Sequence, residues 1–283
     1  MTIRIATDST CDVPTEWAQQ FGIAVVPCYI TIGTQGFLDG VDLSRQEFYA
    51  QLPYYSEFPR TAAPGIDIFV RTYEQLVAEG ATEIIAIHLS STLSAVYSVA
   101  QVAAQQVTRA RVTVFDSRQL SLGAGWQAVT AARMAQAGAT VPEILAALRE
   151  QIARTQACAV IDTLENLRRG GRISWLLAGL GTALQIKPVL RVHDGQVTIE
   201  KTRTRKGALE RLLQLMQTWG ALRHLAVVYT DRPERADELR QLIQQRFPTL
   251  NSEICLQVTP ILGAHLGPGA AGVVCITEKE WRN

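Results

Sequence analysis

The sequence lacks the short motifs of the common nucleotide-, metal- and serine-dependent enzymes. It has no GxxxxGK[ST] loop, no GxGxxG directly after a predicted strand, no HExxH and no GxSxG. The first motif binds nucleotide phosphates, and the second binds a dinucleotide. The third binds zinc, and the fourth presents a nucleophilic serine on a strained turn. A nucleotide-binding enzyme is therefore poorly supported. Nucleophilic catalysis is also weakly supported, because no serine has an identifiable base beside it in the sequence.

Cysteine is scarce and scattered. The five cysteines are odd in number, and none belongs to a CxxC pair or to a Cys/His spacing typical of a metal site; they are Cys11, Cys28, Cys158, Cys255 and Cys275. We therefore expect buried thiols in a reducing cytosol, with no metal centre and no resident cofactor.

Long hydrophobic runs are also missing. The longest, residues 173–186, lies between Arg172 and Lys187 and is shorter than the roughly 20 residues that a membrane helix needs. The N-terminal MTIRIATDST contains an apolar run too short for a signal peptide. We expect a cytoplasmic protein without a membrane span.

An excess of charge of either sign is absent too. Lysine and arginine number 27 against 26 acidic residues, which gives a net charge of +1. This balance provides no electrostatic footprint for nucleic acid, so we expect no nucleic-acid partner. Hydrophobic residues make up 47% of the 283 residues, enough for the core of one large domain or two ordinary ones.

The most informative stretch that is present runs from Glu83 to Ala104, EIIAIHLSSTLSAVYSVAQVAA. Its apolar run over residues 84–89 predicts a buried strand, and the small residues after Ser94 predict a helix. Hydroxyl groups and free helix N–H groups would then meet at the carboxyl end of a strand, where a parallel sheet binds small anions. An anionic head group such as a carboxylate is one reading. Serines that only cap the helix are the other.

Polar clusters at predicted strand ends give the organisation of the first half. They follow three short apolar runs, each leads into a helical segment, and they are Asp8-Ser9-Thr10, Ser90-Ser91-Thr92 and Asp116-Ser117. This alternation predicts a parallel sheet with helices on both faces, over residues 1–156. Other expectations here are a strand over residues 23–32, a loop over 33–42, a helix over 43–52 capped by Ser44, and a helix over 66–79 with Thr61 as its N-cap.

The second half has a different pattern. We predict strands over residues 157–164 and 225–230, a buried apolar helix over 175–186, and helices over 165–169, 207–219 and 233–247. Asp194-Gly195 between two apolar runs is a strong hairpin signal. The last segment reads as two strands, 253–259 and 273–277, that flank a glycine-rich turn. Residues 157–283 should therefore form a mixed sheet covered mainly on one face.

His265 is the most interesting titratable side chain. Gly263, Gly267 and Gly269 surround it, and Pro268 fixes the local turn. An imidazole in this setting can donate a hydrogen bond to an anion or act as an acid or base near neutral pH. The alternative is a structural histidine that binds backbone carbonyl groups.

Two basic clusters stand out in the second half. One surrounds Gly170-Gly171 and the other follows the hairpin; their members are Arg168, Arg169 and Arg172, then Arg203, Arg205 and Lys206. They suit a phosphate or an acidic partner surface. A solvated charged face is the plainer interpretation.

Taken together, these segments resemble the DegV family, whose members bind one long-chain fatty acid. The matching residues run in the family's order along nearly the whole chain: Thr7-Asp8-Ser9-Thr10, Thr61 with Pro64, Ser90-Ser91 with Leu93-Ser94 and Tyr97, Asp116-Ser117, Thr163-Leu164-Glu165, Gly170-Gly171-Arg172-Ile173-Ser174, Ile186-Lys187-Pro188, Asp194-Gly195, and His265 with Gly267-Pro268-Gly269. The resemblance implies an α/β fold in which a three-layer parallel α/β domain is followed by a smaller two-layer α/β domain with a mixed sheet.

The resemblance also implies a function. A long-chain fatty acid such as palmitate would lie in an interior tunnel between the domains. A separate ATP-dependent fatty acid kinase subunit would phosphorylate its carboxylate, and the acyl phosphate would feed phospholipid synthesis. The chain itself would be non-catalytic. By position, Thr61, Ser91, Ser94 and His265 would hold the carboxylate, while Arg172, Arg203, Arg205 and Lys206 would contact phosphate or the partner.

The sequence departs from the family pattern on both sides of this implied site. Ala62 and Ala63 replace a serine and a glutamine, and Ala95 and Val96 replace a glycine and a threonine. Hydroxyl and amide groups are lost, so the hydrogen-bond set at the head group is left open. Two other functions remain open as well: an enzyme that uses His265 on a small carbonyl or phosphorylated metabolite, and an interaction module with no interior cavity.

Overall fold

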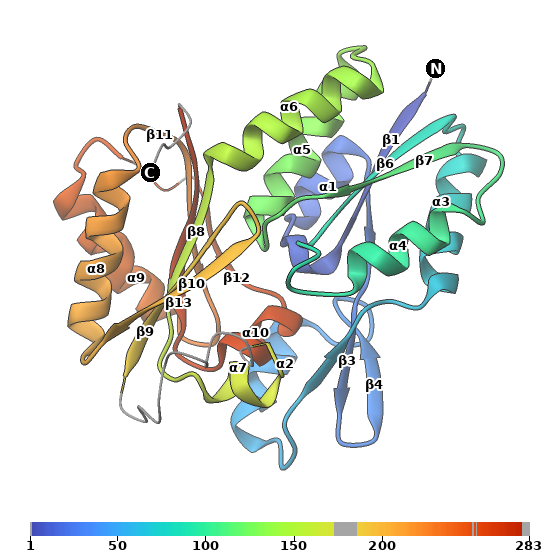
Figure 1. Ribbon diagram of the computed structural model, residues 1–283. Coiled ribbons are helices and arrows are strands. Elements are labelled where there is room, and N and C mark those ends of the chain that lie inside the picture. The colour runs from blue at the N-terminus through green and yellow to red at the C-terminus, as the bar shows by residue number, and fades with distance from the viewer. Residues whose placement is uncertain (1, 173–185, 251, 253, 279–283) are drawn as a thin grey trace.

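The computed structural model describes residues 2–172, 186–250, 252 and 254–278, and two layered sheets dominate it (Figure 1). The elements of the first half are β1 (Ile3–Asp8), η1 (Ser9–Cys11), α1 (Thr15–Phe21), β2 (Ile23–Val26), β3 (Tyr29–Ile32), β4 (Gln35–Leu38), α2 (Arg45–Gln51), η2 (Leu52–Tyr54), β5 (Arg60–Ala62), α3 (Ile66–Ala78), β6 (Glu83–His88), α4 (Val96–Ala104), β7 (Arg111–Asp116), α5 (Leu122–Gln136) and α6 (Val141–Arg154).

The first sheet is parallel, in the order β2-β1-β6-β7. Strand β6 is buried along its whole length, which explains its continuous apolar run. Its alternate side chains enter different cores: Ile84 packs with α3 and α4, whereas Ile85 packs with α5 and α6. Helices therefore cover both faces, which confirms the predicted three-layer arrangement.

The second sheet has six strands in the order β10-β9-β8-β13-β11-β12. All pairs are antiparallel except β11 with β12, so the sheet is mixed as predicted. Its elements are β8 (Thr155–Val160), α7 (Glu165–Arg169), β9 (Lys187–His193), β10 (Gln196–Thr202), α8 (Arg205–Thr218), β11 (Leu222–Tyr229), α9 (Pro233–Arg246), β12 (Ile254–Gln257), α10 (Pro260–Leu266) and β13 (Ala271–Thr277).

Among the described residues, the long helices α8 and α9 pack on one face of this second sheet. Cys158, Val227 and Val273 pack against α8 and α9, which stand together on the outer side in Figure 1. Their sequence neighbours Val228 and Val274 face the other way, toward the first sheet. Successive side chains of a strand point to opposite faces of the sheet, so the second apolar face is turned to the centre of the molecule.

Local turn chemistry explains the β9–β10 hairpin. Asp194 and Gly195 have φ values of 47° and 74°, and two positive φ values define a type I′ turn. The predicted hairpin is therefore confirmed.

Two other expectations for the second half concern residues 175–186 and the boundary between the halves. The predicted helix over residues 175–186 lies, but for its last residue, outside the described residues. The predicted boundary between residues 156 and 157 falls inside β8.

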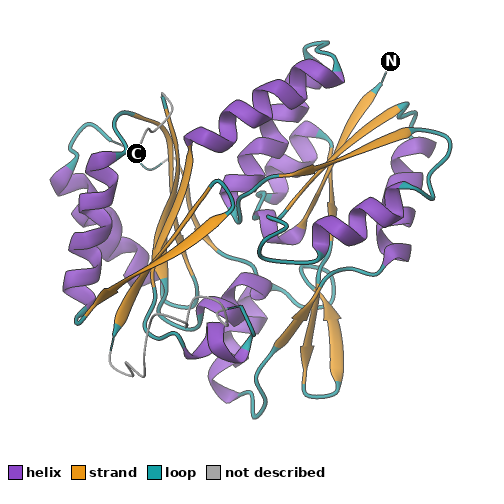
Figure 2. Cartoon of the chain, in the orientation of Figure 1, coloured by secondary structure: helices purple, strands orange, loops and turns teal. Residues whose placement is uncertain are grey.

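A small third sheet, β4-β3-β5, corrects two expectations (Figure 2). The predicted strand over residues 23–32 is two strands in different sheets, because Pro27 has no N–H to continue the ladder. The predicted loop over residues 33–42 contains β4, which pairs with β3.

Thr61 does not cap a helix, contrary to our expectation. It lies in β5 opposite Ile30, and α3 starts only after Gly65. Pro64 accounts for the difference, because the residue before a proline is disfavoured in the helical region and keeps the chain extended.

The glycine-rich turn predicted near residue 265 is also wrong, since residues 260–266 form helix α10. Thr259 caps this helix through its hydroxyl, which accepts from Leu262 N at 3.5 Å, and Pro260 occupies its first turn. A threonine followed by a proline is a helix-start signal, so this element was readable from the sequence.

Two further properties bear on the site. All five cysteines are free thiols; four are buried as expected, whereas Cys255 is exposed, contrary to our expectation. Across the described ranges, no helix combines the length and hydrophobicity needed to cross a bilayer.

Candidate functional site

A cavity of about 130 Å³ lies between the strand ends of the first sheet and the face of the second sheet that is turned away from α8 and α9. Its wall is mostly aliphatic, and the apolar side chains come from both halves of the chain. They include Leu89, Leu93, Val96 and Leu120 from the first half, and Ala157, Leu190, Val192, Val197, Val228, Ile261, Leu262, Leu266 and Val274 from the second.

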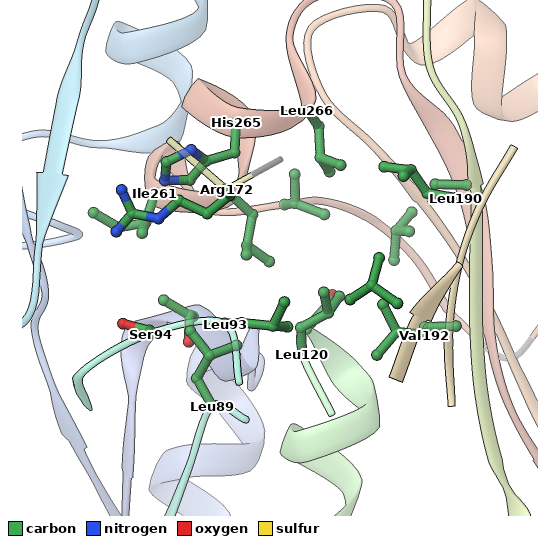
Figure 3. Close-up of a pocket in the computed structure, with 18 of the residues that line it drawn as sticks. Leu89, Leu93, Ser94, Leu120, Arg172, Leu190, Val192, Ile261, His265 and Leu266 are labelled. Carbon is green, nitrogen blue, oxygen red and sulfur yellow. The ribbon is translucent and has the colours of Figure 1, made fainter. Parts of the chain in front are cut away.

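Three of the polar side chains that line this cavity lie at one end. Ser94, Arg172 and His265 lie together in Figure 3, and Leu190 and Val192 lie at the opposite end. Thr61 joins the polar end through its contact with His265. The cavity is thus amphiphilic: one end offers hydrogen bonds and a cation, and most of the remaining wall offers apolar contact.

Ser94 reaches the cavity because of a tight turn after β6. Its backbone N donates to Ser90 O at 3.3 Å, and its hydroxyl accepts from Val96 N at 3.4 Å. The hydroxyl of Thr92 donates to Gly195 O at 2.8 Å, which ties the turn to the β9–β10 hairpin. The N-cap of α4 is Ala95, which has no capping side chain.

Ser91 is placed differently from Ser94. Its hydroxyl donates to Asp116 Oδ2 at 2.5 Å, and its backbone N donates to Asp116 Oδ1 at 3.2 Å. The residue is exposed and is not part of the cavity wall. Of the four residues expected at the head group, the structure therefore brings Thr61, Ser94 and His265 together and leaves Ser91 outside.

His265 occupies the last turn of α10, with its ring wedged between Thr61 and Gly170. Its Nε2 lies 2.7 Å from Thr61 Oγ1, across 204 positions of sequence. Its Nδ1 is buried and has no hydrogen-bond partner among the described residues. A Cβ atom on Gly170 would lie 2.3 Å from that Nδ1, so the glycine is what allows the ring to fit.

Burial and, to a smaller extent, the positive charge of Arg172 together lower the pKa of His265 to about 4. The imidazole is therefore neutral at physiological pH. A neutral ring carries one donor and one acceptor nitrogen, so it can pass a hydrogen bond between Thr61 and a bound anion without adding charge of its own.

Arg172 supplies the positive charge at this end of the cavity. It is half-buried, and its Nη1 donates to Gly170 O at 2.6 Å. Burial lowers the pKa of Arg172, yet a guanidinium stays charged in proteins. Within the part of the chain that the structure describes, no carboxylate forms an ion pair with it. Among the described residues, its charge is therefore not neutralised by an acidic side chain.

The other basic candidates lie elsewhere. Arg205 pairs with Glu238 at 3.2 Å and lies 3.8 Å from Asp162, and its Nη1 donates to Gly269 O. Arg203 and Lys206 are exposed, and none of the three lines the cavity. Their predicted contact with phosphate or a partner stays a prediction.

Sequence reasoning missed Thr10 and Ser121, which also line the cavity. Thr10 belongs to a polar cluster that we had noted at a strand end. Ser121 has φ 50° and ψ −145°, a backbone conformation that no sequence signal announced. Among the described residues, no cluster of His, Cys, Asp or Glu side chains is arranged to hold a metal ion.

The low pKa of His265 predicts a pH-dependent stability. Because the folded-state value lies below the ordinary 6.5, the unfolded chain binds the proton first as the pH falls. The stability contributed by neutral His265 is complete above pH 6.5 and is lost as the pH falls toward 4. Relative to His265→Gln, the lipid-free protein should lose about 2 kcal/mol of unfolding free energy between pH 7 and 4.5. Urea unfolding of both proteins across this range is the measurement, and a pH-independent difference would contradict the prediction.

Comparison with known proteins agrees with this fold. The family model described as uncharacterised protein, DegV family, matches residues 2–278. A DegV domain-containing protein from Streptomyces coelicolor is 34% identical over 275 residues, which cover 96% of this chain and 97% of the relative. Protein DegV from Bacillus subtilis is 33% identical over 282 residues, which cover 96% of this chain and 98% of the relative.

Solved structures give the same result. A DegV family protein from Thermus thermophilus, described for its fatty acid binding, has 30% identity and a TM-score of 0.87, with 98% of this chain and 100% of that chain covered. DegV from Bacillus subtilis, described as a fatty acid binding protein, has 30% identity, a TM-score of 0.89 and the same coverage. Family model, relatives and solved structures all span nearly the whole chain, and the protein therefore belongs to the DegV family.

Proposed function

We propose that this protein binds a single long-chain fatty acid, such as palmitate, in the central cavity. The observation that carries the proposal is the division of this cavity into an aliphatic wall and one polar end, where Arg172 forms no ion pair with any described residue. A molecule that matches both parts has a long apolar tail and one anionic head. The fatty acid binding described for relatives of the same fold supports this choice.

Burial of the tail supplies most of the binding free energy. At about 0.8 kcal/mol per buried CH₂ group, a tail of about fourteen methylenes contributes roughly 11 kcal/mol before opposing terms. Loss of translational freedom and ordering of the chain cancel a large part of this. A few polar contacts at the head are then enough for tight binding, and they mainly set the direction of the ligand.

The head group contacts follow from the polar end of the cavity. In this proposal Ser94, Arg172 and the Thr61–His265 pair hold the carboxylate. Ala62 and Val96, which replace polar residues of the family pattern, also line the cavity. The remaining hydroxyls and the guanidinium therefore carry the head group, and the tail points toward Val192.

We further propose that the protein works in the cytoplasm and presents the carboxylate to a separate ATP-dependent fatty acid kinase. The acyl phosphate formed there would feed phospholipid synthesis, and this chain would not catalyse the transfer. The low pKa of His265 supports a binding role. With a pKa near 4 the imidazole is too weak a base to accept a proton efficiently at neutral pH. It also carries no extra proton there, so it cannot act as a general acid. An interaction module without an interior cavity is inconsistent with the cavity described above.

Native mass spectrometry of the gently purified protein tests the lipid proposal. We expect a mass increase equal to one long-chain fatty acid, lost on delipidation and restored by palmitate. A protein that carries no lipid and cannot be loaded would overturn the proposal.

The kinase step predicts a defect in two variants. Ser94→Ala and His265→Ala each remove a group from the polar end, and a hydrogen bond to a charged group contributes about 1.5–3 kcal/mol. Phosphorylation of bound palmitate by a fatty acid kinase subunit should therefore fall about 10–100-fold at subsaturating protein. Ser91→Ala, on the same turn but outside the cavity, is the matched control and should behave like the unchanged protein. Wild-type rates in either test variant would show that the head group lies elsewhere.

A further inference from the structure

The helix that carries His265 depends on residues from the opposite end of the chain. Helix α10 spans only Pro260–Leu266, which is too short to be stable without packing. Its last turn is held by the contact between His265 and Thr61. The first turn of α10 must be held as well, because the direction of the imidazole depends on both ends of the helix.

Three side chains from the first fifty residues bind the segment that leads into α10. Thr259 N donates to Asp12 Oδ1 at 2.9 Å. Arg45 Nη1 donates to Gln257 O, and its Nη2 lies 3.1 Å from Asp12 Oδ1. The hydroxyl of Tyr49 lies 3.1 Å from Val258 O and 3.4 Å from Thr259 O. Every residue from 257 to 259 is thus held by Asp12, Arg45 or Tyr49.

These three residues are themselves firmly placed. Asp12 is buried, and its Oδ2 accepts from the hydroxyl of Ser121 at 2.5 Å. Arg45 and Tyr49 are one helical turn apart on α2, so they share a face. Helix α2 begins at a capping box in which Ser44 and Glu47 bond to each other's backbone N–H.

Tyr49 also touches α10 directly. A Cβ atom on Gly263 would lie 2.1 Å from the Tyr49 hydroxyl oxygen, so the glycine allows the ring to lie against the helix. Gly263 is two positions before His265. A shift of the tyrosine would therefore move the helix at a point close to the imidazole.

We infer that Asp12, Arg45 and Tyr49 are positioning residues, which fix α10 so that His265 meets the head group of the ligand. The inference rests on the proposed function for its ligand, but the placement of His265 can be measured without any ligand. None of the three residues lines the cavity, so any effect they have on the ligand passes through residues that do. Arg45 and Tyr49, the two residues substituted in the test, contact the segment that leads into α10.

The test uses Tyr49→Phe and Arg45→Met in the full chain, with Tyr73→Phe as the matched control. Tyr49→Phe keeps the ring and removes only the hydroxyl. Tyr73 is a fully buried tyrosine on α3, and its hydroxyl lies 3.4 Å from His88 Nε2. We expect palmitate affinity to fall about 3–10-fold in Tyr49→Phe and about 10–100-fold in Arg45→Met, and to change less than about twofold in Tyr73→Phe.

The second readout is the NMR titration of His265 in the lipid-free proteins. The pKa should lie near 4 in the unchanged protein and in Tyr73→Phe, and should rise toward 6.5 in Tyr49→Phe and Arg45→Met as the ring leaves its buried position. A stabilising role alone would lower the melting temperature without moving this titration. An unchanged His265 titration in a folded Tyr49→Phe would overturn the inference. Failure of the unchanged protein to bind palmitate would instead overturn the proposed function, and the titration would still decide the role of the three residues.

Discussion

Val192→Trp should shorten the acyl chain that the protein accepts. Val192 is a buried residue of β9 on the sheet face that turns toward the cavity, at the end away from His265. An indole there would fill the space of the last few methylenes of the tail. If four methylenes lose their place, at about 0.8 kcal/mol each, affinity for palmitate should fall roughly 100-fold.

Ligands of different length separate this effect from misfolding. Decanoate should bind Val192→Trp with nearly unchanged affinity, since a shorter tail does not reach the indole. Thr198→Trp provides the matched control, because Thr198 is an exposed residue of the adjacent strand β10 and should tolerate the same side chain for both ligands. Calorimetric titration of the delipidated proteins gives the affinities. Equal losses for palmitate and decanoate would mean that the tail does not extend toward β9.

Arg172→Met should remove the preference of the protein for a carboxylate. Methionine keeps an apolar side chain of similar reach but has no charge and no N–H donors. Because charge-assisted hydrogen bonds contribute about 1.5–3 kcal/mol, palmitate affinity should fall about 10–100-fold. Hexadecanol has the same tail and no charge, so its affinity should change less than about threefold.

The comparison of these two ligands isolates the head group. Arg168→Met is the control, since Arg168 is an exposed α7 residue paired with Glu165 and lies outside the cavity wall. Loss of the nearby positive charge should also raise the pKa of His265, which gives a ligand-independent check by NMR. If Arg172→Met bound palmitate like the unchanged protein, or lost both ligands equally, Arg172 would not be the carboxylate contact.

The elements that were predicted correctly are those with strong local signals. The apolar run of β6 and the Asp194-Gly195 turn act over a few residues, so their structure follows from neighbouring side chains and backbone preferences. The polar clusters at successive strand ends were enough to predict a parallel sheet. Errors arose where a proline or a helix cap was given too little weight, at Pro27, Pro64 and Thr259.

The candidate site was predictable only in part. The resemblance to the DegV family pointed to Thr61, Ser94 and His265, which lie together, but it also pointed to Ser91, which binds Asp116 instead. Nothing in the local sequence distinguishes Ser91 from Ser94. The direction of each hydroxyl depends on the turn between them and on the strand beside it, and that strand is 25 positions away.

The sequence by itself determined the two sheets, because alternation, turn residues and strand ends are properties of neighbouring positions. Tertiary structure alone decided that the face of the second sheet turned away from α8 and α9 would enclose a cavity with the first sheet. It also decided that His265 would meet Thr61 while Asp12, Arg45 and Tyr49 hold its helix. These contacts join residues more than 200 positions apart. Their geometry depends on how the first and second halves of the chain pack against each other, and no sequence pattern within one half specifies it.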